Sequence, residues 1–173
     1  SGGISIDQNE YAATIKKIEL LEKKTEEENV KELSRKQYKE YRGLIGKLGW
    51  LCEQSRPDMA YEVLSLAFKN KDATIDDMKE ANKAVERIKN YPSEVEYKKV
   101  GPFSELKVLA VSDASFKTID AKNKSVGGRL VFLSNKEETC VSPLLWKGKS
   151  IPTTCKSAKS SETRALDKTI AHR

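Results

Sequence analysis

The hydrophobic pattern of this chain changes its period near Pro92, and that change limits the folds open to it. Before Pro92, apolar residues recur every three or four positions, which is the spacing of one face of an α-helix. After Pro92, apolar runs of strand length are separated by polar turn residues. The sequence therefore predicts an α+β protein in which a small helical bundle precedes a sheet.

The helical part is expected over residues 34–92 as three helices joined by short connections. Ser34 can cap the first helix, and Pro57 stands in the first turn of the second. The third begins near Thr74 and ends before Pro92. Upstream of this bundle, the pattern predicts a short strand at residues 4–8 and a further helix over residues 11–21.

The first bundle helix carries a row of three glycines, at Gly43, Gly46 and Gly49. Each glycine costs a helix up to about 1 kcal/mol relative to alanine. A row of this kind lets another backbone approach closely. The two tryptophans, Trp50 and Trp146, are expected to be core or interface residues rather than platforms for stacked bases.

The sheet part is predicted as a succession of strands followed by a helix. Strands are expected at residues 95–97, 106–111, 126–133 and 141–147, with a hairpin at 134–138 and a helix from residue 157. Asp113 would then lie just past the end of a buried strand, and Glu162 in the first turn of the helix. Two carboxylates at such a junction can hold Mg²⁺, which prefers oxygen ligands. The alternative is that Asp113 is a turn residue and Glu162 favours the helix dipole.

Composition narrows the classes of function. The net charge of +6 fits an anionic partner such as nucleic acid, although 26 acidic residues are interleaved with 32 basic ones. The single histidine, His172, argues against a Ser–His–Asp triad or a histidine-built metal site. Cys52, Cys140 and Cys155 match neither a zinc site nor a disulfide framework, which indicates reduced thiols in an intracellular protein. No apolar run approaches the ~20 residues of a membrane span.

Residues 41–61 carry an ordered motif, Y-R-x-L-[IV]-G-x-L-x-[YW]-L-x-x-x-[ST]-R-P-D-[IM]-x-[YF]. It resembles the segment after the polymerase palm in copia-type LTR retrotransposon polyproteins. The matching positions are Tyr41, Arg42, Leu44, Ile45, Gly46, Leu48, Trp50, Leu51, Ser55, Arg56, Pro57, Asp58, Met59 and Tyr61.

Further pieces extend the resemblance over nearly the whole chain. Residues 4–11 are similar to the close of the palm, and residues 112–116, 128–133, 146–149 and 160–166 to ribonuclease H motifs of the same family. The resemblance implies a palm-end strand and helix at 1–33, a three-helix thumb- or connection-like bundle at 34–92, and a partial ribonuclease H-like domain at 93–173. That last domain would be a mixed sheet with a helix.

The activity that the resemblance implies is cleavage of the RNA strand of an RNA–DNA hybrid. Asp113 and Glu162 would be the catalytic acids and would bind Mg²⁺ or Mn²⁺. The family pattern needs a third acid on a strand after this helix, and the sequence stops at Arg173. Asp167 is turned away from Glu162 on a helix, and no motif supports Asp120. We therefore expect a fragment with little or no nuclease activity alone, so the resemblance leaves open whether this chain is an enzyme.

The competing expectations are a catalytically inactive nucleic-acid-binding module and a protein-assembly module derived from such an element. Partners would be RNA–DNA hybrid or other nucleic acid, and the remaining polymerase and ribonuclease H segments or another chain. The location would be the cytoplasm, the nucleus or virus-like particles. Candidate nucleic-acid contacts, each also readable as an ordinary surface charge, are Lys36, Lys39, Arg42, Lys47, Lys147, Lys149, Lys156 and Lys159.

Overall fold

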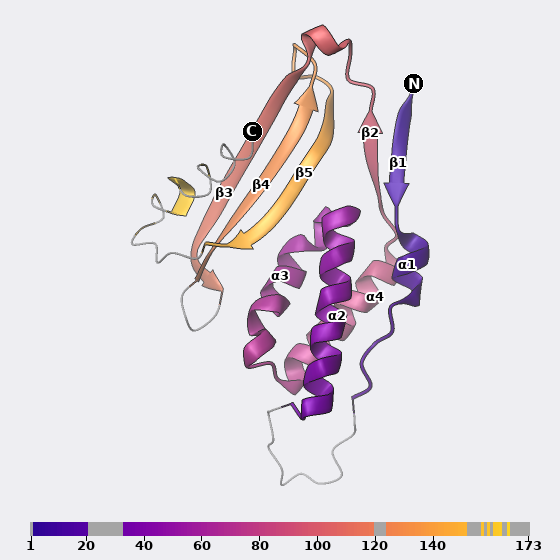
Figure 1. Ribbon diagram of the computed structural model, residues 1–173, viewed down its shortest axis with the longest axis vertical. Coiled ribbons are helices and arrows are strands. Elements are labelled where there is room, and N and C mark those ends of the chain that lie inside the picture. The colour runs from indigo at the N-terminus through magenta and orange to yellow at the C-terminus, as the bar shows by residue number, and fades with distance from the viewer. Residues whose placement is uncertain are drawn as a thin grey trace. The chain divides into compact units, whose positions relative to one another are not determined.

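The structure, a computed structural model, describes residues 2–20, 33–119, 124–151, 157, 159, 161–163 and 166. The chain divides into two compact units. One, the helical unit, is Gln8–Ser93, and the other, the sheet unit, combines Ser1–Asp7 with Glu94–Arg173. The ribbon in Figure 1 shows helices in the first unit and mainly strands in the second. The expected α+β class is confirmed.

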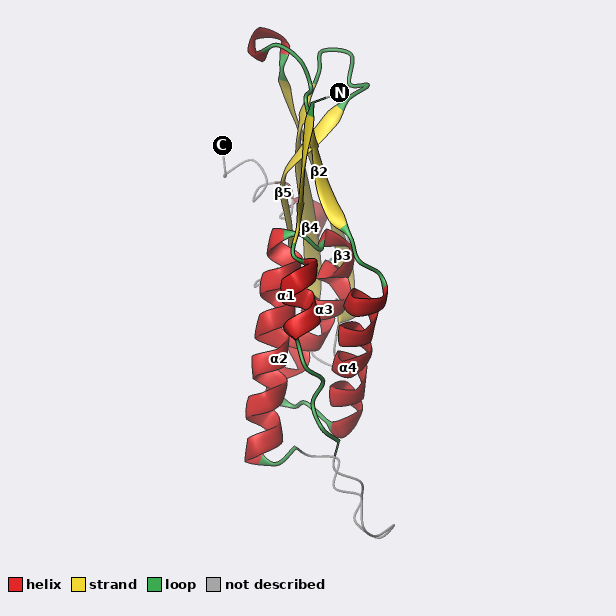
Figure 2. Ribbon diagram, turned by 90° about the vertical axis from the view of Figure 1, so that its right-hand side faces the viewer, coloured by secondary structure: helices red, strands yellow, loops and turns green. Residues whose placement is uncertain are grey.

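The expected bundle is present in the helical unit. Its elements are α1 (Asn9–Thr14), α2 (Arg35–Gln54), the 3₁₀ turn η1 (Pro57–Met59), α3 (Ala60–Phe68), the 3₁₀ turn η2 (Lys69–Lys71) and α4 (Ile75–Asn90). Figure 2 shows α2 and α4 running side by side. No helix among the described residues combines the length and apolar character needed to cross a membrane.

Two of these helices begin at capping boxes. The Ser34 hydroxyl accepts a hydrogen bond from the Gln37 backbone N–H at 3.3 Å, and the Gln37 side chain accepts one from the Ser34 N–H at 3.0 Å. Thr74 and Asp77 form the same reciprocal pair at the start of α4. Each box satisfies backbone donors that the first helical turn leaves unpaired, so these two starts are fixed by local sequence.

The core of the helical unit is an apolar cluster to which every helix contributes. Tyr41 and Leu48 of α2 and Met78 of α4 are fully buried in it. The Tyr41 hydroxyl donates to the Leu66 carbonyl oxygen of α3 at 2.9 Å, so that its polar atom is paired inside the core. Tyr91 is the C-cap of α4 and is exposed.

The helix predicted over residues 11–21 is wrong beyond Thr14, the last residue of α1. Residues 15–20 are not helical, although Ile15 and Ile18 are buried. The Asn82 side chain accepts from the Ile18 N–H at 2.8 Å and donates to the Ile18 carbonyl at 2.9 Å. This side chain on α4 replaces the helical hydrogen bonds of Ile18, so a tertiary contact overrides the local pattern.

The turn between α2 and α3 is built around Arg56, which is only 3% exposed. Its guanidinium donates to both carboxylate oxygens of Asp58, at 2.9 and 2.8 Å, and to the Ile88 carbonyl at 3.3 Å. Ile88 lies in the last turn of α4, where carbonyl groups lack helical partners. Arg56 therefore joins this turn to the end of α4.

Among the described residues, the sheet unit contains two antiparallel sheets. β1 (Gly3–Asp7) pairs with β2 (Glu94–Lys98), and β3 (Lys107–Ile119), β4 (Lys124–Ser134) and β5 (Val141–Ser150) form a sheet in that order. A 3₁₀ turn, η3 (Phe103–Glu105), precedes β3. Every pairing described is antiparallel, so the expected mixed sheet is not seen in this part of the chain. The segment expected as one piece over 1–33 is divided, because β1 pairs with β2.

The predicted hairpin joins β4 to β5 and is confirmed. The Asn135 side chain accepts from the backbone N–H groups of Thr139 and Cys140, at 2.9 and 3.0 Å. Glu138 takes a positive φ of 59° within this turn. The turn residues thus pair their own backbone donors, as turn-forming asparagines commonly do.

Candidate nucleic-acid interface and carboxylate site

One exposed face of α2 combines basic side chains with glycines and a tryptophan. We call it the basic-glycine face, and it consists of Lys36, Lys39, Gly43, Gly46, Lys47 and Trp50. With 3.6 residues per turn, these positions fall within about 100° of the helix circumference. They lie opposite the stripe that α2 buries. Packing of the core therefore decides which side of α2 is available to a partner.

The glycines of α2 border open space. A β-carbon added at Gly43, Gly46 or Gly49 would meet nothing within 4 Å. The row expected to admit another backbone is thus not filled by the helical neighbours of α2. Glycine removes side-chain bulk, so an external ligand could approach the helix backbone at Gly43 and Gly46.

Trp50 is held in place while remaining 47% exposed. Its ring meets the ring of Tyr11 edge-on, with centroids 4.8 Å apart and planes at 77°. The sequence analysis expected Trp50 to be a core or an interface residue. It is not a core residue, and the interface role stays a prediction. Its separation from Lys39, Gly43 and Gly46 by eleven, seven and four residues was the signal that places it on the exposed face of the helix.

The basic candidates of α2 are all exposed, but their local partners differ. The Arg42 guanidinium lies 5.8 Å from the centre of the Tyr38 ring, within the range of a cation–π contact. Lys36 forms a long ion pair of 3.9 Å with Glu40. Among the described residues, Lys39 and Lys47 form no ion pair, which leaves their charges available to a phosphate.

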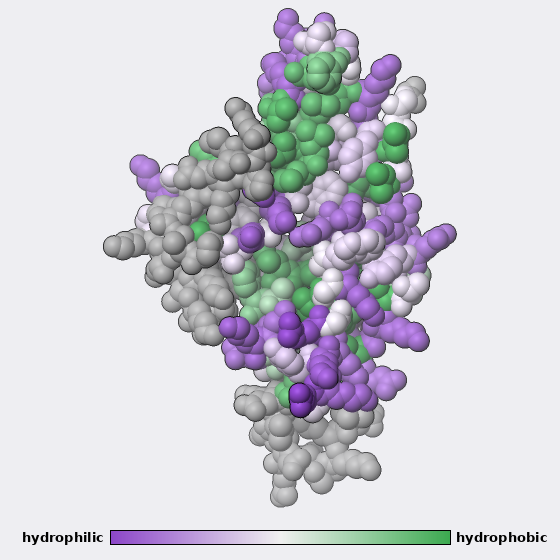
Figure 3. Space-filling view, viewed as in Figure 1, coloured by the Kyte–Doolittle hydropathy of each residue, from purple (hydrophilic) through white to green (hydrophobic). Residues whose placement is uncertain are grey.

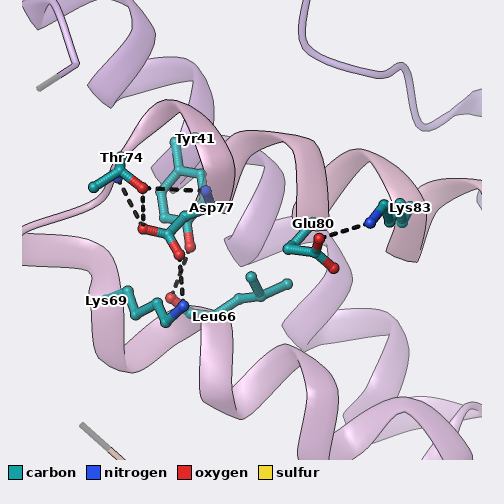
Figure 4. Close-up of polar contacts among 7 residues, drawn as sticks. All are labelled: Tyr41, Leu66, Lys69, Thr74, Asp77, Glu80 and Lys83. Carbon is teal, nitrogen blue, oxygen red and sulfur yellow. Dashed lines mark hydrogen bonds and ion pairs between the residues drawn. The ribbon is translucent and has the colours of Figure 1, made fainter. Parts of the chain in front are cut away.

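Beneath α2, a polar cluster fixes how the helices meet (Figure 4). Asp77 of α4 accepts from the Lys69 ammonium at 2.6 Å and from the Thr74 N–H and hydroxyl at 2.9 and 2.8 Å. Burial alone would raise the pKa of Asp77, but these hydrogen bonds outweigh it and hold the pKa below its usual value. Burial raises the pKa of Tyr41, and the Asp77 charge adds to that effect.

Asp113 lies in the middle of β3 rather than just past a strand end. Its backbone pairs with Gly128, and Gly128 pairs with Gly148 of β5. The strand continues because β4 supplies partners as far as Ile119. The Asp113 side chain is exposed, and its carboxylate accepts from the Ala114 N–H at 2.8 Å. The carboxylate therefore lies in solvent, and its cross-strand neighbours on β4 and β5 are glycines without side chains.

Two candidate nucleic-acid contacts, Lys147 and Lys149, lie on the face of the sheet opposite to Asp113. Cross-strand partners share a face, so Asp113 lies on the face of Gly128 and Gly148. Lys147 and Lys149 flank Gly148 on β5, and successive side chains alternate. These two exposed lysines are thus separated from the carboxylate by the sheet itself.

Glu162 is exposed on a helical segment, in which residues 159, 161–163 and 166 are described as helical. Lys159 is also exposed there, whereas Lys156, Asp120 and Asp167 lie outside the described residues. Among the residues that the structure describes, no group of three or more acidic, histidine or cysteine side chains could hold a metal ion. The carboxylates of Asp113 and Glu162 suit Mg²⁺ in chemistry, but two of them fall short of a full ligand set.

Cysteine chemistry does not contribute a second site in the described chain. Cys52 is buried, and burial, followed by the charge of Asp58, raises the pKa of its thiol to about 12. A thiol with so high a pKa is a poor nucleophile and metal ligand at neutral pH. Cys140 is a free thiol in the β4–β5 turn, and Cys155 lies outside the described residues.

The chain matches no protein-family model, and comparison with curated proteins and with solved structures gave no significant match.

Proposed function

We propose that this chain binds RNA–DNA hybrid through the basic-glycine face of α2. It would do so as the thumb- or connection-like part of a copia-type reverse transcriptase and ribonuclease H. The observation that carries the proposal is the exposed face itself. There Lys39 and Lys47, which form no ion pair within the described part of the chain, flank open glycines and a half-exposed tryptophan.

The chemistry of this face fits a duplex backbone. Lysine ammonium groups attract phosphates and release counterions from the nucleic acid. An A-form duplex presents a wide, shallow minor groove that is contacted mainly through its sugars, phosphates and shape. Gly43 and Gly46 let the helix backbone approach such a surface, and Trp50 offers a flat ring beside them. Recognition of this kind would depend on shape more than on base sequence.

In a larger protein, the sheet unit would contribute to Mg²⁺- or Mn²⁺-dependent hydrolysis of the RNA strand. Support comes from Asp113, an exposed carboxylate beside the open position at Gly128. Asp113 and Glu162 would hold the metal ion, which would stabilise charge developing on the phosphate. Further acids would have to complete this ligand set.

A protein-assembly role is the second candidate, and one observation favours it. The sheet leaves apolar side chains exposed on the face of Val111, notably Val111 at 54% and its cross-strand partner Leu130 at 41%. Figure 3 shows hydrophobic residues gathered over these strands on one face. Clustered apolar residues on a surface often mark protein interfaces.

The hybrid-binding proposal is tested by measuring affinity for an RNA–DNA hybrid over a range of salt concentrations. The wild-type affinity should fall as salt rises, and the slope of log affinity against log salt should grow with the number of phosphate contacts. The double variant Lys39→Gln/Lys47→Gln should bind more weakly. Its salt slope should be smaller than that of the wild type by the equivalent of about two phosphate contacts.

The matched control is Lys83→Gln/Lys89→Gln, which removes the same charge from exposed positions of α4. This control should keep the wild-type slope. Equal losses in both double variants would show that only net charge matters, and the proposal for α2 would then be abandoned. Concentration-dependent dimerisation without hybrid binding would instead support the assembly role.

A further inference from the structure

The outer edge of β3 lacks the features that normally prevent a strand from pairing with another chain. Within the described chain β3 pairs with β4 alone, so β3 and β5 are the two edges of the three-stranded sheet (Figure 1). An edge presents backbone N–H and C=O groups to other strands, and proteins commonly protect it with proline, charge or a bulge. β5 has two of these protections, Pro143 and the extra residue Leu144. Residues 108–112 of β3 have none of them.

The two ends of this unprotected stretch carry opposite charges. Lys107 precedes it and Asp113 follows it, and because they are six residues apart, their side chains lie on one face of the sheet. The Asp113 carboxylate is exposed and accepts from the Ala114 N–H at 2.8 Å. The Lys107 ammonium lies 3.4 Å from Glu138 in an exposed ion pair, which contributes little and can be exchanged for another carboxylate. A partner strand can therefore reach both charges.

The sequence of this stretch is complementary to itself in one antiparallel register. If a two-fold axis places Ala110 opposite Ala110 of a second copy, Lys107 lies opposite Asp113 of the other copy at both ends of the pairing. Leu109 then lies opposite Val111 on the same face. An axis moved by one residue, to Val111, would place Asp113 opposite Leu109 and lose both charge pairs. The register centred on Ala110 therefore combines opposite charges with apolar pairs.

Pairing in this register would also cover exposed apolar surface. Val111 is 54% exposed and lies on the face that carries Leu109 and Leu130. A second copy would continue this face and place Leu109 beside Val111 across the new strand pair. On the other face Val108, which is 58% exposed, would gain Ser112 as its cross-strand neighbour. The backbone edge and the side chains thus favour the same partner.

We propose that β3 is a homodimerisation edge, which pairs antiparallel with β3 of a second copy to form one continuous sheet. The inference rests on the protein-assembly role, the second candidate function, and names its surface and its partner. It is independent of hybrid binding by α2, which belongs to the other unit. The pairing involves residues 107–113 of each copy, far fewer than the roughly 20–30 residues a side of a standard interface. The dimer should therefore dissociate on dilution.

The test is sedimentation equilibrium of the full chain over a range of concentrations, with EDTA because Asp113 is also the proposed metal ligand. The wild type should be a reversible dimer. Lys107→Glu and Asp113→Lys each place like charges at both ends of the pairing, and each should raise the dimer dissociation constant about tenfold. An equimolar mixture of these two variants has opposite charges at both ends and should dimerise like the wild type. The double variant Lys107→Glu/Asp113→Lys should do the same.

Restoration by the mixture would identify a contact between copies, because Lys107 and Asp113 of one strand lie about 20 Å apart. Lys136→Glu makes the same charge change in the exposed β4–β5 turn and should leave the dimer intact. A wild-type dimer that the single charge reversals do not weaken, or a mixture that does not restore it, would overturn the β3 inference and leave the assembly role standing. A chain that is monomeric at every concentration would overturn both, and the hybrid titrations decide the α2 proposal separately.

Discussion

At the scale of single residues, Arg56 shows how a motif position can serve the fold. Its buried guanidinium is matched by Asp58 on one side and by the Ile88 carbonyl on the other. The hydrogen bond from Arg56 holds the pKa of Asp58 below its usual value. A buried charge with these partners is tolerated, whereas removal of one partner would leave the other unpaired. The Arg–Pro–Asp motif is therefore explained by structure without any contact to a ligand.

Asp77 provides a prediction about stability and pH. Its pKa lies below the ordinary 3.8, so its ionised form stabilises the fold above that value. The contribution disappears as pH falls below 3.8, because protonation removes the negative charge that Lys69 pairs with and turns one carboxylate oxygen into a donor. Asp77→Asn should lower the free energy of unfolding by about 1 kcal/mol at pH 7. The difference from wild type should shrink below pH 4 in urea unfolding curves.

Asp76 offers a control from the same helical turn. Its side chain is 85% exposed and pairs with Lys79 on the surface. Surface ion pairs contribute little to stability, so Asp76→Asn should cause a smaller loss with a weaker pH dependence. A loss as large as that of Asp77→Asn would contradict the role assigned to the buried cluster.

At the scale of elements, the glycines of α2 predict a conflict between stability and binding. Gly46→Ala meets no neighbouring atom, so it should raise the free energy of unfolding by up to about 1 kcal/mol through helix propensity. The same methyl group stands on the basic-glycine face and should weaken hybrid binding. Thermal unfolding and hybrid titration of one preparation measure both effects.

Gly49 supplies the comparison, because it has the same open surroundings but lies off the basic-glycine face. Gly49→Ala should stabilise α2 and leave hybrid affinity unchanged. If Gly46→Ala stabilises the protein and binds hybrid as well as wild type, close approach of a ligand to Gly46 is ruled out.

The helices and strands also show which structural features local sequence patterns predict correctly and which they do not. Ser34 and Thr74 identify helix starts correctly, because capping is a contact between residues three apart. The helix expected through residue 21 ends at Thr14, since Asn82, far away in sequence, binds the backbone of Ile18. The strand expected to end before Asp113 continues because β4 pairs beyond it. Local signals fail where a distant partner supplies the hydrogen bonds.

At the scale of the whole molecule, the two candidate carboxylates predict a chain that cannot cut hybrid efficiently. Mg²⁺ keeps its waters and binds weakly to one or two carboxylates unless substrate phosphates assist. We expect purified protein with Mg²⁺ to leave a labelled RNA–DNA hybrid intact in a gel assay. Metal-dependent cleavage that is lost in Asp113→Asn would contradict this expectation, and would show that the chain completes its own ligand set.

The sequence by itself determined the change from helices to strands near Pro92, the capped starts of α2 and α4, and the hairpin between β4 and β5. Each depends on side-chain periodicity or on contacts between neighbours in the chain. The tertiary structure decided that Trp50 and the glycines face outward, and that Lys147 and Lys149 lie across the sheet from Asp113. Those outcomes depend on which face the core buries and on strand register, and both are set by partners distant in sequence.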